Sequence, residues 1–297
     1  NGTCKCPNAT VGDTAVINGV TYTVVDNSTF AGQILNGNVN LCTTLVTNMK
    51  DTFQGNSSFN SDISFWDTSN VTNMMFMFQG ATSFNQPIGN WDTSNVTAMD
   101  LMFADTNLFN QPIGNWDTSN VTNMGQMFFM SKSFNQPIGN WDVSSVTNMD
   151  SMFRGAIFNQ PIGNWDVSNV TNMNQMFDSA YNQDLSGWCV SKITSVPQNF
   201  TYTMTNSNIP VWGTCPNTYT VDVTASNATD YTLSGSDRSG NISGSDPAIV
   251  INRGDKITFN VNAAGHPFYI KTVQGTGTDN LVSGVTGNGA DNGAVTF

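Results

Sequence analysis

Five aspartates recur at a nearly constant interval and are the best candidates for a metal site in this sequence. Carboxylate oxygens are the ligands that calcium prefers, although the dense Asp-x-Asp spacing of a calcium loop is missing here. Each aspartate also stands just before an expected helical turn, where a carboxylate can cap unpaired N–H groups. We take capping as the first interpretation and calcium binding as the alternative. The five residues are Asp67, Asp92, Asp117, Asp142 and Asp166.

Asn-x-Ser/Thr sequons are the second candidate chemistry, because such asparagines accept N-linked glycans in a eukaryotic secretory pathway. Four of them occupy the same position of a repeated phrase, and Ser145 interrupts this series. Chance matches are common in a chain so rich in Asn and Thr, so a purely structural role stays open. The candidate glycosylation sites are Asn8, Asn27, Asn56, Asn70, Asn95, Asn120, Asn169, Asn199, Asn227 and Asn241.

The ionisable residues do not predict an enzyme. The chain has one histidine, His266, and few acids outside the aspartate series. These residues cannot assemble a catalytic triad. Five equivalent carboxylates also lack the two different environments that acid–base chemistry needs. We therefore expect a protein that is not an enzyme.

Composition and charge narrow the classes of partner. The 297-residue chain is 38% apolar and only 10% charged, with a net charge of -12. Between Asp51 and Trp188 the only bases are Lys132 and Arg154. Because Lys and Arg neutralise phosphates, nucleic-acid binding is not expected. No apolar run is long enough to span a bilayer. The first residue is Asn1 rather than Met, which fits a secretion signal that has been removed.

Five cysteines lie outside the repeated region, three before it and two after it. Disulfides that close the two ends of a core in an oxidising compartment explain this placement. Cys189 and Cys215 are expected to pair. Cys42 is expected to pair with Cys6 or Cys4, and a Cys6 pairing leaves Cys4 free or joined to another chain.

A repeat of 23 to 25 residues is the main feature of the sequence, and a period of this length indicates a solenoid of short coils. Val71, Met74, Met77 and Phe78 follow the spacing of one face of a short helix. Residues 88–92 are expected to form a short strand that pairs in parallel with its copies. The tryptophans that mark the period are Trp66, Trp91, Trp116, Trp141, Trp165 and Trp188.

The expected fold is therefore a β-rich solenoid of leucine-rich-repeat-like coils, each with a short parallel strand plus a helical turn, capped at both ends. The tryptophan and methionine columns are expected to fill its core. A tryptophan stripe that stacks on sugars is the alternative for the first column, and soft metal ligands are the alternative for the second.

The segments outside the repeats suggest caps and a second domain. Residues 14–17 and 20–25 flank Asn18-Gly19, a strong hairpin signal, and Ser28 is expected to cap a helix that runs to about Leu35. Alternating apolar residues after Thr218 predict a small antiparallel β-sandwich. The boundaries are a hairpin-plus-helix cap at 1–44, the solenoid at 45–188, a second cap at 189–216 and the sandwich at 217–297.

Two stretches resemble known families. The phrase "FNQPIGNWDTSNVTNMxxMF" resembles the repeat of the BspA-like leucine-rich-repeat surface proteins over about residues 45–188, which implies an extracellular solenoid used in adhesion or surface display. "INRGDKITFNV" followed by "AGHPFYIKTVQGTG" resembles the first part of a cupredoxin-like domain, which implies that His266 is a copper ligand. The second His, the Cys and the Met of a blue-copper site do not follow. Copper binding is therefore not expected from this sequence, and the sandwich looks incomplete.

These features predict a secreted structural or adhesive protein of the cell surface without a bound cofactor. Because the strands stop at Phe297, a strand from another copy would complete the sandwich, and head-to-tail repetition would build a filament or surface layer. The expected partners are other copies of the chain, or glycans or proteins on a host or neighbouring cell. The alternatives are a glycan- or protein-binding module that uses one solenoid face, and a copper-binding cupredoxin if the chain continues.

Overall fold

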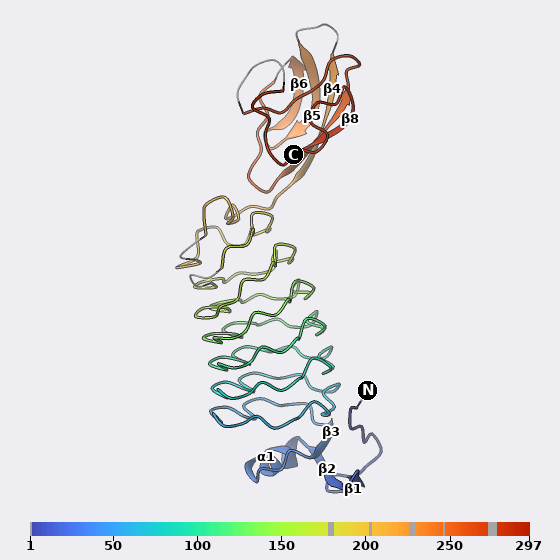
Figure 1. The fold of residues 1–297 in the computed structure, drawn as a ribbon, viewed down its shortest axis with the longest axis vertical. Helices are drawn as coiled ribbons and strands as arrows, with labels where there is room; N and C mark the ends of the chain where they lie inside the picture. Colours follow the sequence, from blue (N-terminus) through green and yellow to red (C-terminus); the bar gives the residue numbers. More distant parts are fainter. Residues whose placement is uncertain (1, 178–180, 202–203, 226–229, 246, 273–277) are drawn as a thin grey trace. The chain divides into compact units, whose positions relative to one another are not determined.

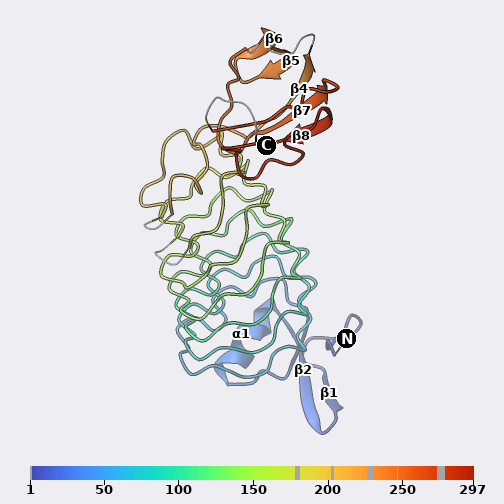
Figure 2. The ribbon, with the colours of Figure 1, turned by 45° about the horizontal axis from the view of Figure 1, so that its top comes forward.

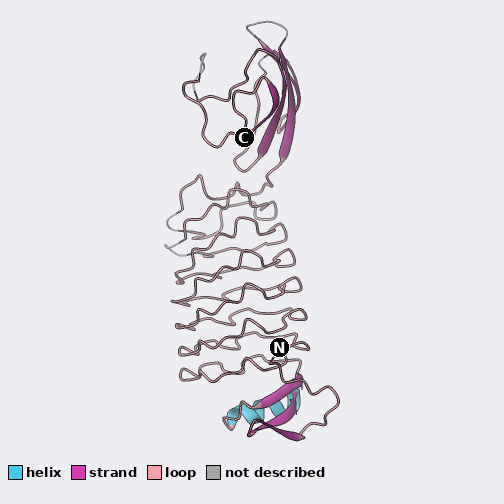
Figure 3. Ribbon diagram, turned by 45° about the vertical axis from the view of Figure 1, so that its right-hand side comes forward, coloured by secondary structure: helices cyan, strands magenta, loops and turns pink. Residues whose placement is uncertain are grey.

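The protein divides into two compact units, residues Asn1–Thr214 and Cys215–Phe297 (Figure 1). The computed structural model describes residues 2–177, 181–201, 204–225, 230–245, 247–272 and 278–297. Helix and strands lie toward the two ends of this described chain, and the repeats between them consist of turns and loops (Figure 3). Each unit is built differently.

The first unit begins with a three-stranded sheet and a helix (Figure 2). Asn18 and Gly19 take the positive φ angles of a tight hairpin turn, at 52° and 80°, and β1 is antiparallel to β2 while β3 is parallel to it. Asp26, rather than Ser28, caps the helix through the N–H groups of Ser28 and Thr29. The predicted hairpin and helix are confirmed. The elements are β1 (Thr14–Ile17), β2 (Val20–Asp26), α1 (Asn27–Leu35) and β3 (Leu41–Leu45).

Each repeat after β3 forms one layer of a stack, and adjacent layers are joined by hydrogen bonds between their backbones (Figure 1). Single parallel bridges, such as Asn48 to Asn73, mark one line of contact. The N–H groups of Phe76 and Phe78 donate to the carbonyls of Asp100 and Met102 in the next layer at 3.1 and 2.9 Å. The backbone N–H groups that a helix would use internally therefore hold neighbouring layers together.

The prediction of a leucine-rich-repeat-like solenoid with helical turns is wrong. The described strands belong to two mixed sheets of three and five strands, α1 is the helix of the described chain, and residues 88–92 form turns and loops. Phe76 takes a φ of +57°, and Leu101, Gln126 and Ser151 repeat this left-handed conformation at +54° to +56°. An L-residue at positive φ interrupts a right-handed helix. The helical spacing in the sequence comes from tight turns on either side of that residue.

The phrase Pro-Ile-Gly-Asn brings a glycine of one layer against a proline carbonyl of the next. A Cβ placed on Gly114 would lie 2.5 Å from the oxygen of Pro137. The equivalent position on Gly139 would lie 2.9 Å from the oxygen of Pro161. Real Cβ atoms do not approach an oxygen this closely, so close packing of the layers requires glycine here.

We expect the substitution Gly114→Ala to lower the free energy of unfolding by about 1–3 kcal/mol, because a backbone carbonyl must move to admit the methyl group. Urea denaturation of the purified chain measures this loss. Gly187→Ala is the matched control, because a Cβ there meets nothing within 4 Å. Equal stability of the two variants would contradict the close-approach explanation.

The second unit contains one five-stranded sheet in the order β6-β5-β4-β7-β8. β4 and β7 are parallel and the other neighbours are antiparallel. The predicted antiparallel sandwich is therefore wrong: the buried face of this single sheet packs against loop residues such as Ile249, Phe268 and Ile270. The strands are β4 (Thr218–Ala225), β5 (Tyr231–Asp237), β6 (Gly240–Ser245), β7 (Lys256–Asn262) and β8 (Asn292–Thr296).

Candidate functional site

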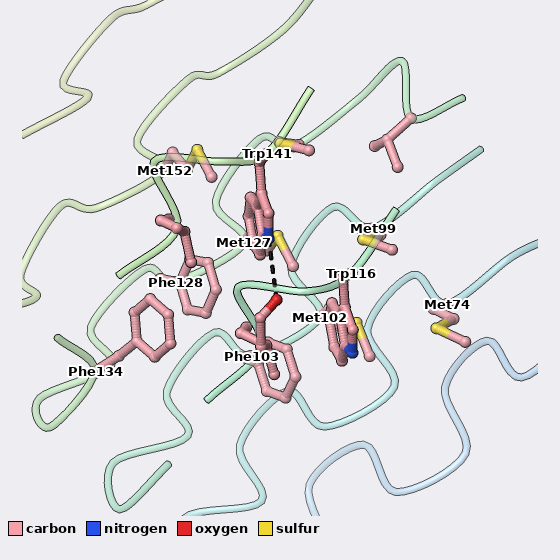
Figure 4. Packing of buried hydrophobic residues seen from close by; sticks show 14 of the residues in the cluster. Met74, Met99, Met102, Phe103, Trp116, Met127, Phe128, Phe134, Trp141 and Met152 are labelled. Atoms are coloured by element: carbon pink, nitrogen blue, oxygen red, sulfur yellow. Dashed lines mark hydrogen bonds between the residues drawn. The ribbon is translucent and has the colours of Figure 1, made fainter. Parts of the chain in front are cut away.

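The tryptophan column lies inside the stack, and each indole makes one polar contact to the preceding layer. The six tryptophans are 1–4% exposed. Trp141 Nε1 donates to the carbonyl of Ile113 at 3.0 Å, and its ring lies parallel to that of Trp116 with centroids 6.5 Å apart (Figure 4). The prediction of a core column is confirmed. A sugar-stacking stripe is excluded for these six residues because their ring faces are covered.

The methionine column is also buried, as predicted. Met74, Met99, Met124, Met149 and Met173 are 0% exposed and belong to the hydrophobic core of the stack, in which Figure 4 shows Met74 and Met99. A flexible thioether fills irregular gaps between large rings. The column therefore serves packing.

Trp212 is a member of the tryptophan series that the sequence analysis missed. It follows Trp188 by 24 residues, the same interval as inside the repeats. Its ring packs edge-on against Phe200 at 4.9 Å, but its buried Nε1 makes no hydrogen bond. The interval alone could have revealed it, although the surrounding phrase is no longer recognisable. The stack therefore ends in a degenerate layer.

The aspartate series caps turns, not helices, so the predicted helix-capping role is wrong. Asp92, Asp117, Asp142 and Asp166 accept the N–H of the residue two positions later at 2.9–3.1 Å. No helix follows them in the described repeats. A short polar side chain that bonds its own backbone in this way stabilises a turn. For Asp142, the hydrogen bonds from Ser144 lower the pKa of the carboxyl group.

Asp67 differs from the other four because the N-terminal segment and β3 cover it. It is 2% exposed, and it accepts hydrogen bonds from Thr44 Oγ1 at 2.7 Å and from Ser69 Oγ at 2.7 Å. Burial works to raise its pKa, but the hydrogen bonds from Ser69 and Thr44 outweigh burial, and the pKa of Asp67 is lowered. Asp67 is thus a satisfied buried carboxylate.

The metal-site candidates do not come together in the part of the chain that the structure describes. No group of three or more His, Cys, Asp or Glu side chains there is placed to hold an ion. His266 is half-buried, and its backbone carbonyl accepts a hydrogen bond from Tyr231 Oη at 3.3 Å. Calcium at the aspartate series and copper at His266 gain no support from this geometry.

The repeated sequon asparagines form a ladder between layers. The Nδ2 atoms of Asn70, Asn95 and Asn120 donate to the carbonyls of Thr44, Ser69 and Ser94 at 2.7 Å. Asn169 makes the same bond to Ser144. These side chains are exposed, yet the atom that would carry a glycan already serves the stack. Glycosylation at these positions stays a prediction, and a structural role is present without it.

We expect the substitution Asn120→Ala to cost about 0.5–1.5 kcal/mol of unfolding free energy, the net value of one hydrogen bond. Ser145→Asn restores the missing member of the series and is expected to gain a bond to the carbonyl of Ser119, with a stabilisation of similar size. Both changes are measured by urea denaturation of unglycosylated protein. If Ser145→Asn is no more stable than the parent, the ladder bond has no net value.

The other sequons lie in different settings. Asn27 accepts the N–H groups of Thr47 and Asn48 at 2.9 and 3.1 Å, so it ties α1 to the first layer. Asn8, Asn56, Asn199 and Asn241 are exposed. Asn227 lies outside the described residues. The hydrogen bonds that Asn27 accepts give it a structural role, and glycosylation at all of these asparagines stays a prediction.

The structure settles the cysteine pairing that the sequence left open. Cys6 and Cys42 form a disulfide between the N-terminal segment and β3, and Cys4 is a free, half-buried cysteine. Burial, followed by the charge of Asp67, raises the pKa of the Cys4 thiol. Cys189 and Cys215 are both disulfide-bonded.

Asp100 is a buried carboxylate that no motif predicted. It is 7% exposed, and its Oδ1 accepts no hydrogen bond. In the next layer, the asparagine at the equivalent of position 98 accepts a hydrogen bond from the turn: Asn123 Oδ1 accepts from the N–H of Gly125 at 3.0 Å. In the layer of Asp100 this asparagine is replaced by Ala98, two residues before Asp100. Burial raises the pKa of Asp100, with smaller opposing effects from its own N–H and from Lys50.

The raised pKa of Asp100 has a defined consequence for stability. The folded state holds this proton more tightly than the unfolded state, so stability falls as the pH rises through the folded pKa. We expect Asp100→Asn to stabilise the chain at pH 7 by about 1 kcal/mol and to have little effect below pH 4. Urea midpoints at both pH values measure this. Asp150→Asn, at the equivalent but half-buried position, is the control, and an equal gain there would contradict the role of burial.

Two further ladders run along the stack, one in the phrase Asn-Gln-Pro-Ile-Gly and one at the threonines of the phrase Asn-Val-Thr. Asn85 Oδ1 accepts from the N–H of Asn110 at 3.0 Å and from Gln111 Nε2 at 2.9 Å. The threonine after each sequon valine donates to the carbonyl of the preceding threonine, as Thr97 does to Thr72 at 3.2 Å. Hydrogen bonds between uncharged groups therefore join neighbouring layers at several positions of the repeat.

The same aromatic core residues and the same hydrogen-bond ladders recur in successive layers. This arrangement is that of a tandem-repeat protein. Two segments, residues 22–129 and 108–212, match the model of the family described as "Mycoplasma protein of unknown function, DUF285". Together they span more than half of the chain, so the chain belongs to this family. Residues 108–129 are matched twice, as expected where one repeat resembles the next.

Both resemblances suggested by the sequence are corrected. The family that matches is not that of the BspA-like leucine-rich-repeat proteins, and the repeats lack the helical turns of such coils. The cupredoxin-like assignment is wrong because the second unit is a single mixed sheet. Searches of curated proteins and of solved structures returned no match. None of the described residues form a helix that could cross a lipid bilayer.

Proposed function

We propose that this chain is a non-catalytic, extracellular structural or adhesive protein in which the repeat stack acts as a stiff spacer. The observation that carries the proposal is the set of inter-layer ladders. Outward-facing Asn, Gln and Thr side chains donate to backbone carbonyls of the preceding layer, so these groups support the neighbouring layer and are engaged within the stack. Such a surface suits a scaffold.

The disulfides and the low charge support an extracellular setting. Disulfides persist in oxidising compartments, and the Cys6–Cys42 bond ties the N-terminal segment to β3. Only 10% of the residues are charged, so the stack depends little on ion pairs that salt would screen. Its stability should therefore tolerate the variable salt of an extracellular environment.

Surface labelling of intact source cells tests the location. An antibody raised against the full chain, followed by immunogold electron microscopy, is expected to label the outside of intact cells. Label that appears only after permeabilisation would overturn the proposal. Filaments or a lattice of labelled material would support assembly among copies, which stays a prediction.

Hydrogen exchange tests the stiffness. Because each layer bonds to the next, backbone amides in residues 45–188 are expected to exchange slowly and together, as one cooperative unit. Mass spectrometry of the exchanged full chain gives this directly. Rapid exchange of individual middle layers would contradict a stiff spacer and favour a flexible linker.

A further inference from the structure

One face of the five-stranded sheet carries mainly polar side chains. Along β4, Val221 and Val223 are buried, whereas Asp222 and Thr224 are exposed. β7 alternates in the same way, and in β8 Val295 is buried while Asn292 and Ala294 are exposed, so the apolar side chains form the core of this unit on the opposite face. We call the exposed set the polar sheet face; its central members are Asp222, Thr224, Asn260, Asn262, Asn292 and Ala294.

The strand register brings these six residues into two rows. Asp222 pairs with Asn260, and Asn260 pairs with Ala294. In the next row Thr224 pairs with Asn262, which pairs with Asn292. Residues paired across neighbouring strands on one face lie side by side. Two adjacent carboxamides therefore stand at one end of the face, next to a threonine hydroxyl.

The polar sheet face is hollowed rather than flat. The six residues line an open depression of about 550 Å³, whose remaining lining is Val223, Val261 and Gly293. Small-molecule and saccharide sites generally have volumes in this range. Ala294 keeps the floor of the depression low, and Gly293 of β8 also lines it. A ligand can therefore approach the backbone of β8.

The hydrogen-bonding state of the side chains differs between the rows. Asn260 Nδ2 donates to Asp222 Oδ1 at 3.0 Å, so the one carboxylate of the depression is already engaged. Within the described chain, the carboxamides of Asn262 and Asn292 have no protein partner. Each free carboxamide offers two donor hydrogens and one acceptor oxygen. These groups pair with hydroxyls, which both donate and accept.

Charge selects among ligand classes. Among the residues that the structure describes, no Lys or Arg lines the depression, so a phosphate, sulfate or carboxylate ligand would gain no ion pair there and would face Asp222. The described lining holds no aromatic or long aliphatic side chain either, so a lipid or an apolar peptide would gain little buried area. An uncharged chain of hydroxyl groups complements what remains.

We propose that the polar sheet face binds a neutral polysaccharide, held chiefly by the carboxamides of Asn262 and Asn292. This inference rests on the proposed adhesive role and supplies its ligand class. The bound chain would lie across β7 and β8 over Ala294, with hydroxyl pairs against each carboxamide. The polysaccharide is a separate extracellular chain, not a glycan attached to this protein.

Co-sedimentation of the full chain with insoluble neutral polysaccharides (cellulose, chitin and a β-1,3-glucan) tests the proposal. We expect binding to at least one of the three. The double variant Asn262→Ala, Asn292→Ala is expected to bind about tenfold more weakly, since each lost hydrogen bond costs a few-fold in affinity. Asn241→Ala, an exposed asparagine of β6 outside the depression, is the control and is expected to bind like the parent.

Three results would overturn the proposal: no binding to any of the three polymers, equal binding by the double variant, or stronger binding to the anionic polysaccharide heparin than to the neutral ones. Both side chains are exposed, so their truncation leaves the core intact, and circular dichroism checks that the double variant folds. Failure of this test leaves the cell-surface location untouched, because immunogold labelling reports it independently.

Discussion

Replacing Trp141 with alanine is expected to lower the free energy of unfolding of the repeat stack by about 4–5 kcal/mol. The indole is 3% exposed and lies between Trp116 and Trp165, with ring centroids 6.5 Å away on each side. Phe128 packs against it at 6.3 Å. Truncation leaves a cavity that these rings cannot close, because the layer spacing is held by the backbone.

The same substitution removes a hydrogen bond. Trp141 Nε1 donates to the carbonyl of Ile113 at 3.0 Å, inside the stack, where water cannot replace it (Figure 4). A buried acceptor left without a partner adds to the cost of the cavity. Trp141→Phe separates the two effects, since it keeps most of the ring but loses the donor, and we expect about 1–2 kcal/mol for it.

Urea denaturation and hydrogen exchange measure this effect. The midpoint gives the change in stability, and exchange rates show whether the layers on either side open together. Leu108→Ala is the matched control, because this side chain is 56% exposed and its loss is expected to change stability by less than about 0.5 kcal/mol. A loss below about 1 kcal/mol for Trp141→Ala would contradict a cooperative aromatic core.

The parts of the fold that the sequence predicted correctly depend on local signals or on a constant interval. Asn18-Gly19 supports a tight turn regardless of context, and the hairpin is present. The spacing of the tryptophans identified the core column because each ring occupies the same place in its layer. Such signals need no knowledge of distant partners.

The errors came from positions whose conformation depends on the neighbouring layer. Phe76 has a left-handed backbone although it is not glycine, and its N–H bonds to Asp100 in the next layer. A phenylalanine gives no sign in the sequence that its backbone is left-handed, so the apolar spacing alone predicts a helix. The parallel pairing of β4 with β7 could not be predicted from the sequence, because alternation of apolar and polar residues predicts a strand but not its partner. The carboxamide ladders were missed because sequon motifs suggested another role for Asn95.

The residues that join the strands of the second unit are not marked by any local sequence pattern either. Arg238 follows β5, and Asp255 precedes β7, 17 residues away. Arg238 Nε and Nη2 donate to the two carboxylate oxygens at 2.7 and 2.6 Å, and the backbone N–H groups of Asn217 and Asn252 donate to the same carboxylate at 2.7 Å. This cluster joins the beginnings of β4 and β7 to the β5–β6 turn.

We expect the substitution Asp255→Asn to destabilise the second unit by about 3–5 kcal/mol at pH 7, because it leaves the guanidinium of Arg238 without its charge partner. The carboxylate side chain is 0% exposed and that of Arg238 is 19% exposed, so water cannot fully replace the lost pair. Arg238→Lys keeps the charge but cannot make both bonds at once, and a smaller loss is expected. The hydrogen-exchange protection of the β4 and β7 amides measures the stability of this unit separately from that of the stack.

The loss should also depend on pH in a defined direction. Burial alone would raise the pKa of Asp255, but the bonds from Arg238, Asn217 and Asn252 outweigh it and lower the pKa to about 2. An unfolded aspartate titrates near about 3.9. The contribution is therefore fully present above that value and is lost as the pH falls towards 2. The difference in stability between the parent and Asp255→Asn should shrink between pH 4 and pH 2, whereas Asp279→Asn, an exposed carboxylate, should change stability little throughout. A difference that stays constant over this range would mean that Asp255 acts through packing rather than through its charge.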